Sequence, residues 1–285
     1  MPWKLSSFAD EAADSIDGQI AALREAGLGW IDPRSIDGLN ICDLPVDHAR
    51  QVRAKLDDAG IRVSMFGSPI GKTDVADDLA IEQQRLDHLA RMRDVFEADG
   101  VRMFSFYNKQ DLPREQWKQQ AFDKLSSLRD QAGRLGLVLY HENETDVYGD
   151  HPDHVAELAE LRDGKSFKLI YDFANYQRTG VDPWANWQRL RPVTDCFHFK
   201  DQKKSGDHVP IGQGDSQARE ILADAVASGW DGPCTLEPHL FMSDAVLSTN
   251  VHGRGDTSLA GKTRDELFAV AAAAAKALLA EVGAG

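Results

Sequence analysis

The sequence predicts a single (β/α)8 barrel that occupies the whole chain, residues 1–285. Strand and helix patterns alternate from the N-terminus onward, which is typical of parallel strands connected by helical crossovers. Eight such pairs recur about every 36 residues, and this rhythm matches both the fold and the chain length. Four of the strand candidates also end on residues that can bind a metal ion.

The strand candidates are short apolar segments that contain β-branched and aromatic residues. In chain order they are residues 4–8, 28–31, 61–66, 101–107, 137–142, 167–172, 196–201 and 234–237. Parallel strands need a crossover between them, and helical patterns separate these segments. We therefore predict a parallel barrel sheet.

The helix candidates carry apolar residues at helical spacing and end at helix-terminating residues. In the first of them Ile16, Ile20 and Leu23 share one face, and Gly27 ends the helix. The last helix begins where Thr263 and Glu266 have capping-box spacing. The predicted helices are residues 16–26, 46–59, about 77–98, 114–135, 154–161, 184–190, 218–228 and 263–282.

One long irregular segment, residues 238–262, follows the eighth strand. The loops that follow the strands of such a barrel lie over the face where the carboxyl ends of the strands gather. Glycines at positions 253, 255 and 261 favour a lid over that face or a contact between subunits.

The charge balance argues against a nucleic-acid-binding protein. The chain has 46 acidic and 32 basic residues and a net charge of −14, whereas proteins that bind phosphate backbones carry basic faces. We therefore expect a small-molecule partner. Cys42, Cys196 and Cys234 have no paired spacing, which favours a reducing compartment. Because no signal-like or membrane-length apolar run is present, we expect a cytoplasmic protein without a membrane span.

Four side chains at the ends of successive strands, Glu142, Asp172, His198 and Glu237, predict a metal site. The carboxyl ends of barrel strands meet at one face, so these residues can converge despite their separation in sequence. Any one carboxylate at a strand end is as often an ion-pair partner or a helix cap, and His198 alone would be a core histidine. The combination of three carboxylates with an imidazole favours a divalent cation.

The motifs around these residues resemble those of the sugar phosphate isomerase/epimerase family, within the xylose-isomerase-like barrel superfamily. The motifs are His-Glu-Asn-Glu at 141–144, Tyr-Asp-Phe-Ala-Asn at 171–175, His-Phe-Lys-Asp at 198–201 and Leu-Glu-Pro at 236–238. The resemblance implies a divalent ion held by the four side chains. It does not specify the reaction, because members include ketose epimerases, hydroxypyruvate isomerases, inosose and dehydroshikimate dehydratases, and enzymes that eliminate from 3-keto-glycosides. Related barrels form dimers or tetramers, so a homo-oligomer remains open.

The mostly hard ligands favour Mn²⁺ or Mg²⁺, with cobalt or zinc as alternatives. Such an ion would chelate the carbonyl and a neighbouring hydroxyl of a keto sugar and would stabilise an enediolate. The resemblance to ketose epimerases implies that Glu142 and Glu237 stand on opposite faces of the substrate. These two glutamates are therefore the expected catalytic acid and base.

Further residues near the expected active face are candidates for substrate binding. Lys72 could equally be a solvated loop cation, and Lys200 could form a buried ion pair with Asp201. By strand alternation His141 should point toward the helices, where it would support a ligand rather than catalyse. The substrate-binding candidates are Arg34, Lys72, Tyr107, Asn143, Asn175, Lys200 and His239.

The sequence departs from many related ketose epimerases at position 175. They carry a substrate-binding histidine three residues after the aspartate ligand, and this chain has Asn175. An amide can hydrogen-bond a hydroxyl but cannot transfer a proton at neutral pH, which weakens the case for simple epimerisation. The same change disfavours the multi-zinc endonuclease branch. His239, two residues after Glu237, is the best alternative base or substrate contact.

Our leading hypothesis is a metal-dependent isomerase or epimerase that acts on a keto sugar or cyclic polyol through an enediolate. The alternative within the family is a lyase or dehydratase that eliminates a β-substituent from a 3-keto-glycoside or an inosose. A hypothesis of another class is a sugar-binding barrel without turnover, or a subunit of a larger assembly. Metal analysis separates the classes, because a barrel with no catalytic role has no need for all four ligands.

Overall fold

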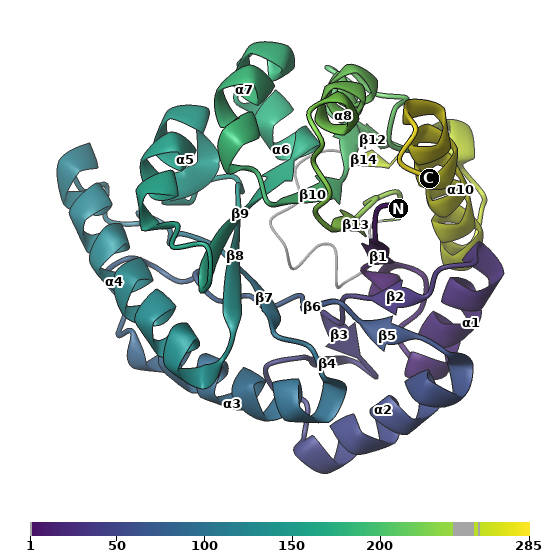
Figure 1. Cartoon of the computed structure of the whole chain (residues 1–285), viewed down its shortest axis with the longest axis horizontal. Helices are drawn as coiled ribbons and strands as arrows, with labels where there is room; N and C mark the ends of the chain where they lie inside the picture. Colours follow the sequence, from purple (N-terminus) through teal and green to yellow (C-terminus); the bar gives the residue numbers. More distant parts are fainter. Residues whose placement is uncertain (1, 242–253, 256) are drawn as a thin grey trace.

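The strands lie at the centre of the molecule, and the helices surround them (Figure 1). The computed structural model describes residues 2–241, 254–255 and 257–285. The barrel strands are β1 (Leu5–Ser7), β2 (Trp30–Ile31), β5 (Arg62–Val63), β6 (Met65–Phe66), β7 (Gly100–Met103), β8 (Val138–Glu142), β9 (Phe167–Asp172), β10 (Cys196–Phe199) and β13 (Cys234–Leu236). The predicted fold class, a TIM barrel, is confirmed.

Seven strands form one parallel sheet in the order β1-β13-β10-β9-β8-β7-β6, and β2 pairs with β5. Main-chain hydrogen bonds connect the two sheets. The Asp32 amide donates to Ser7 O, and the Ser64 amide donates to Ile31 O, both at 2.9 Å. β2 therefore lies between β1 and the β5–β6 segment, and the strands close into a ring.

Three strand predictions differ from the structure. The predicted strand 196–201 is divided at Lys200, because β10 ends at Phe199 and Asp201–Gln202 forms a short strand of another sheet. The predicted strand 61–66 is divided at Ser64, so that β5 pairs with β2 while β6 pairs with β7. The predicted strand 101–107 ends at Met103. Phe106 adopts a positive φ of 69°, which a continuing strand does not permit, and the segment instead hydrogen-bonds to the loop after β6.

The helices on the outside of the barrel begin and end close to the predicted positions. Ser15 accepts a hydrogen bond from the Gly18 amide at the start of the first helix, and Gly27 ends it with a φ of 64°. The Thr263–Glu266 capping box is present. The helices are α1 (Ile16–Ala26), α2 (Val46–Ala59), α3 (Ala80–Phe96), α4 (Arg114–Leu135), α5 (Pro152–Leu158), α6 (Phe173–Arg178), α7 (Pro183–Leu190), α8 (Ala218–Ala227) and α10 (Arg264–Val282).

Two helices differ from the sequence prediction. α3 begins at Ala80 rather than near residue 77, because the Asp77 carboxylate accepts from the Asp74 amide and closes a turn there. α6 was not predicted. It begins directly after β9, where Asp172 caps it by accepting a hydrogen bond from the Asn175 amide at 2.8 Å.

Segments that follow the barrel strands form two small additional sheets. β3 (Ser35–Ile36) and β4 (Leu39–Asn40) form a hairpin after β2. β12 (Asp207–Val209) pairs with β11 (Asp201–Gln202) and with β14 (Arg254–Gly255). The predicted lid or subunit contact in 238–262 falls largely outside the described residues and stays a prediction. No helix in the described ranges combines the length and apolar composition that crossing a bilayer requires.

The interior of the barrel contains a small apolar cluster beneath the predicted metal ligands. Tyr140, Ile170 and Cys196 precede three of those ligands by two residues, so strand alternation places them on the same inner face. They pack together with Met65 as a cluster separate from the main core. The ligand side chains therefore lie next to an apolar cluster, at the carboxyl end of the barrel.

Candidate metal centre

The four predicted ligands converge at one point. Glu142 ends β8, Asp172 ends β9, His198 lies on β10 and Glu237 directly follows β13. Each offers one ligand atom such that all four atoms lie within 4.8 Å of one another. All four residues are at most 1% exposed. Adjacent parallel pairing brings them together, since His198 is in register with Asp172 in the sheet.

Carboxylate oxygens of Glu142 and Glu237 lie close to the imidazole of His198. His198 Nδ1 lies 2.9 Å from Glu142 Oε1 and 3.3 Å from Glu237 Oε2. Lys200 Nζ lies 3.0 Å from Asp172 Oδ2 and 3.6 Å from Glu237 Oε2. Within the described residues, Asp172 Oδ2 and Glu237 Oε2 have no hydrogen-bond partner. These two buried oxygens are therefore balanced by the charges of Lys200 and His198, and a metal cation could take over that balance.

The protonation behaviour of the cluster reflects its excess of buried negative charge. Burial raises the pKa of Asp172 to about 7, although Lys200 opposes the rise. Burial disfavours a charged His198, yet Glu142 and Glu237 raise the pKa of this imidazole to about 9. Burial would also raise the pKa of Glu237, but Lys200 and His198 hold it well below its usual value. The cluster thus binds protons in the same place where a metal ion would supply positive charge.

Arg102 on β7 is a buried cation at this site that the sequence analysis missed. Its NH1 lies 3.3 Å from Glu142 Oε2 and 3.3 Å from Glu237 Oε1, the oxygens of the two glutamates that do not face His198. The guanidinium carbon also lies 4.6 Å from the centroid of the Phe8 ring. A charged residue between apolar neighbours in a buried strand was the available signal, because alternation would have directed it into the barrel.

Arg34 reaches the centre from the loop after β2, as a substrate-binding candidate should. Its NH1 lies 3.1 Å from Glu237 Oε1, and its Nε donates to Asp10 Oδ2 at 2.8 Å. Glu11 lies next to it, 3.6 Å from Arg34 NH2. Burial raises the pKa of Glu11 to about 8, with Arg34 opposing. Asp10 and Glu11 follow β1 and were not predicted as site residues. Their position after a strand end was the same signal that indicated the other carboxylates.

His239 lies between two carboxylates beside the metal centre. Its Nε2 is 3.3 Å from Glu237 Oε1 and 3.7 Å from Glu11 Oε1, and its amide donates to Glu11 Oε2 at 2.8 Å. The residue is 1% exposed and adopts a positive φ of 49°. Burial and Lys200 hold the pKa of His239 well below its usual value, so the imidazole is neutral.

Asn143 and Asn175 form a frame that fixes Asp172. Asn143 Oδ1 accepts from the Asp172 amide at 2.8 Å, and Asn143 Nδ2 donates to Asp172 O at 3.2 Å. Asn175 donates its amide proton to Asp172 Oδ1 and its side-chain proton to Asn143 O, both at 2.8 Å. The structure thus uses these asparagines to orient a ligand, and Asn175 Oδ1 has no partner in the described part of the chain.

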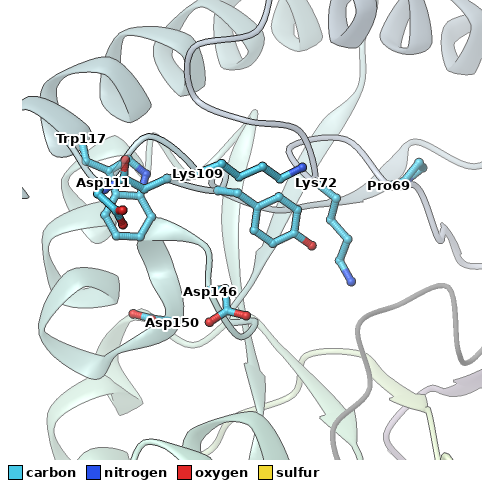
Figure 2. Close-up of a pocket in the computed structure, with 9 residues that line it drawn as sticks. Pro69, Lys72, Lys109, Asp111, Trp117, Asp146 and Asp150 are labelled. Atoms are coloured by element: carbon cyan, nitrogen blue, oxygen red, sulfur yellow. The ribbon is translucent and has the colours of Figure 1, made fainter.

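Lys72 and Tyr107 lie farther out, in the wall of a pocket beside the cluster. Lys72 Nζ lies 3.0 Å from Glu144 Oε2. Burial disfavours the charged form of Glu144, but Lys72 and Lys200 lower its pKa to about 2. The pocket has a volume of about 830 Å³, and Lys72 and Asp146 lie in its wall (Figure 2). Lys72 is therefore an ion-paired residue at the edge of the site rather than a solvated loop cation.

The structure tests the alternative proposed for Lys200 and the orientation predicted for His141. Lys200 pairs with Asp172, whereas Asp201 accepts hydrogen bonds from the Gly212 and Gly214 amides and holds that turn. The predicted alternative of a Lys200–Asp201 ion pair is therefore wrong. His141 points away from the ligands, as alternation requires, and stacks on Phe167 with ring centroids 6.4 Å apart. Burial lowers the pKa of His141 to about 3.

Comparison with known proteins identifies the family and supports the fold. The family model for xylose isomerase-like TIM barrels matches residues 20–244. No curated protein sequence matches the chain. Among solved structures, a D-psicose 3-epimerase in the presence of D-fructose is similar with a TM-score of 0.75 and 15% identity, over 99% of this chain and 100% of that one.

Two further solved structures are similar over nearly their full lengths. A probable 3-DHS dehydratase from Bacillus anthracis has a TM-score of 0.71 and 16% identity, over 97% of this chain and 99% of that one. A xylose isomerase-like TIM barrel protein from Mycobacterium smegmatis, in complex with magnesium, has a TM-score of 0.64 and 19% identity, over 96% and 97%. At these identities the structures establish a shared fold. With the match to the family model across most of its length, the chain belongs to the xylose isomerase-like TIM barrel family.

Proposed function

We propose that the protein is a divalent-metal-dependent isomerase or epimerase that moves a proton beside the carbonyl of a keto sugar or cyclic polyol. The observation that carries this proposal is the buried set Glu142, Asp172, His198 and Glu237, whose ligand atoms lie within 4.8 Å of one another. The similarity to an epimerase and to a dehydratase supports a carbohydrate-like substrate.

The donor set fits a divalent cation. Three carboxylates and one imidazole suit Mn²⁺ best, with Mg²⁺, cobalt or zinc as alternatives, and the similarity to a magnesium-bound barrel supports a hard ion. The two buried oxygens without hydrogen bonds, Asp172 Oδ2 and Glu237 Oε2, match the need of such an ion for anionic ligands. When bound, the ion would polarise a substrate carbonyl and make the adjacent C–H more acidic.

The chain's own groups then supply proton transfer and orientation. Glu142 and Glu237 approach the centre from β8 and from the end of β13, and we assign to them the removal and return of the proton. To Lys200 and Arg34, which form ion pairs with Asp172 and Glu237, we assign the binding of substrate oxygens and the stabilisation of the negative charge that develops. His239 lies against Glu237 and can accept a hydrogen bond from a substrate hydroxyl. The remaining proposed substrate-binding residues are Tyr107, Lys72, Asn143 and Asn175.

A second candidate function, β-elimination by a lyase, is favoured by the position of Arg102. Its NH1 lies 3.3 Å from Glu142 Oε2 and 3.3 Å from Glu237 Oε1. A two-base epimerisation needs both of those oxygens in turn, and a guanidinium bound to both makes them weaker bases. An elimination needs one base and then an acid for the leaving group, a role open to Lys200.

The test is solvent hydrogen exchange. The metal-loaded protein is incubated with ketoses, inososes and 3-keto-glycosides in deuterated water, and the products are analysed for structure and deuterium position. We expect deuterium at the carbon beside the carbonyl. An inverted centre or a moved carbonyl would identify the isomerase or epimerase, whereas loss of a substituent would identify the lyase.

Variants of the two glutamates make the test specific. Glu142→Gln and Glu237→Gln should each lower the exchange rate by about 100-fold or more, because each removes a proton-transfer group. Asp231→Asn, at an exposed position before β13, is the control and should exchange at the wild-type rate. Full exchange in both glutamine variants would remove these residues from the mechanism. A purified chain that binds no divalent ion at neutral pH would instead support a barrel without turnover.

A further inference from the structure

The pocket beside the metal centre, which we name the distal pocket, is built by three loops that follow neighbouring barrel strands. Lys72 comes from the loop after β6, and Tyr107 and Lys109 come from the loop after β7. Asp146 and Asp150 come from the loop after β8, and Trp117 is presented by α4. Loops that follow barrel strands share one face, so the distal pocket opens on the same face as the metal ligands.

The walls of the distal pocket are pre-formed by main-chain hydrogen bonds. The Phe104 and Phe106 amides donate to Ile70 O and Gly71 O, both at 2.8 Å, and the Tyr148 amide donates to Phe106 O at 3.2 Å. Phe106 holds a positive φ of 69°, which a bulky residue adopts only when its surroundings enforce it. The three loops are therefore fixed to one another, as expected of a binding site that is ordered before its ligand arrives.

The lining chemistry matches a hydroxylated ring. The rings of Trp117 and Tyr107 offer apolar faces against which the C–H groups of a sugar can pack. The carboxylates of Asp146 and Asp150 accept hydrogen bonds from hydroxyls, and Figure 2 shows both in the lower wall. The buried indole Nε1 of Trp117 has no hydrogen-bond partner among the described residues.

Lys72 is the residue of the distal pocket that lies nearest in contact to the metal ligands. This side chain lines the pocket, and its ammonium group lies 3.0 Å from Glu144, which is two residues after the ligand Glu142. A volume of about 830 Å³ lies within the range of roughly 300–1,000 Å³ that small-molecule sites usually have. A ligand that places its carbonyl at the metal centre and also fills this volume must extend beyond a single ring.

We propose that the distal pocket binds a second, hydroxylated ring of the substrate, so that the natural substrate is a glycoside or another two-ring sugar derivative rather than a free monosaccharide. This inference rests on the proposed proton-transfer function for its reacting ring. It assigns Trp117 and Asp146 as specificity residues that touch the second ring.

The first experiment compares a matched pair of substrates. Deuterium exchange by the metal-loaded full chain is measured with a free 3-keto-hexose and with the same ring linked to a second glucose. We expect kcat/KM to be at least about tenfold higher for the two-ring substrate, the gain from a few added hydrogen bonds and ring contacts. Equal kcat/KM values would overturn the inference.

The second experiment removes the pocket's contacts. Asp146 has a positive φ of 67°, so Asp146→Gly deletes the carboxylate without backbone strain. We expect this variant to raise KM for the two-ring substrate by about tenfold and to leave the single-ring substrate unchanged. Trp117→Leu, with a smaller ring-free side chain, should act in the same direction. Asp231→Gly is the matched control outside the pocket. Equal losses for both substrates would overturn the inference.

A direct binding measurement separates this inference from the proposed reaction. Wild type and Asp146→Gly are titrated calorimetrically with underivatised disaccharides, which do not react. Binding that Asp146→Gly weakens would support the distal pocket even if no substrate exchanges deuterium, in which case only the proposed reaction fails. If deuterium exchange continues but neither Asp146→Gly nor Trp117→Leu changes the preference for the two-ring substrate, the proposed reaction stands. The assignment of the distal pocket to a second ring is then wrong.

Discussion

Two buried carboxylates inside the same barrel, Asp32 and Asp172, are held in opposite ways. Asp32 accepts from three neutral donors, Ser6 Oγ at 2.9 Å, Thr235 Oγ1 at 2.6 Å and the Met65 amide at 3.0 Å. Asp172 Oδ1 accepts from a backbone amide, while its Oδ2 faces Lys200 at 3.0 Å and has no hydrogen bond in the part of the chain described.

The difference teaches what distinguishes a structural carboxylate from a ligand. Neutral hydroxyl and amide donors are fixed by the backbone, so Asp32 ties β1, β13 and β6 together at one place. The negative charge on Asp172 Oδ2 is balanced by the Lys200 ammonium group, and a metal ion can balance that charge instead. Burial raises the pKa of both residues, so burial alone does not identify the functional one.

The largest expected effect concerns stability and Asp32. Asp32→Ala removes the acceptor for three buried donors, so the free energy of unfolding of the metal-free protein should fall by about 3 kcal/mol or more. Urea unfolding measures this. Asp32→Asn, which keeps one acceptor oxygen, should lose less. A loss below about 1 kcal/mol in the alanine variant would contradict a structural role for the Asp32 network.

The complementary prediction concerns metal affinity and Asp172. Asp172→Asn should weaken Mn²⁺ binding by more than about 100-fold, the upper end of what loss of a supporting group costs. Its stability without metal should change little, because asparagine still caps α6. Calorimetric titration of chelator-treated protein gives the affinity. Asp32→Asn serves as the control and should bind the ion as wild type does. Equal Mn²⁺ affinities for Asp172→Asn and wild type would contradict the assignment of Asp172 as a ligand and of Asp32 as a structural residue.

Metal addition should stabilise the folded protein through the same ligands. At a free Mn²⁺ concentration about 100 times the Kd, the free energy of unfolding should rise by about 2.7 kcal/mol. For a chain of 285 residues that corresponds to about 5 °C in Tm. Scanning calorimetry with and without the ion tests this. A similar shift in Asp172→Asn would show that the ion acts elsewhere.

The smallest expected effect is the pH dependence of metal affinity. Because the pKa of His198 is raised to about 9, a proton occupies the imidazole below that pH and must leave when the ion binds. Affinity should therefore increase with pH, by up to about tenfold per unit, and level off near pH 9. Apparent Kd values at pH 7, 8 and 9 measure the slope. A flat profile would mean that His198 is not a ligand.

Local sequence patterns were sufficient to predict the barrel and the four converging side chains. Strand alternation and strand ends depend on residues that are neighbours in sequence, and the fold rule for parallel barrels places all strand ends on one face. The same reasoning failed where tertiary contacts override local pattern. β7 ends early because Phe106 is held at a positive φ by the adjoining loops, and α6 forms because Asp172 caps it.

The contacts between the ligands and the residues around them could not be predicted from sequence, because these residues come from distant parts of the chain. Arg34 and Glu237 are 203 positions apart, and Arg102 and Glu237 are 135 positions apart. No local signal indicates that such side chains meet. Their contacts depend on how the ring of strands closes and how far each long side chain extends.

The amino-acid sequence by itself determined the order of strands and helices, the face on which the strand ends gather, and the types of residue at those ends. Only the tertiary structure decided which oxygens of Glu142 and Glu237 face His198 and which face Arg102. It also decided that Asp32 is satisfied by neutral donors while Asp172 is not. The physical reason is that periodicity specifies the side of an element on which a residue lies, whereas the partner it meets there is set by barrel closure and side-chain packing.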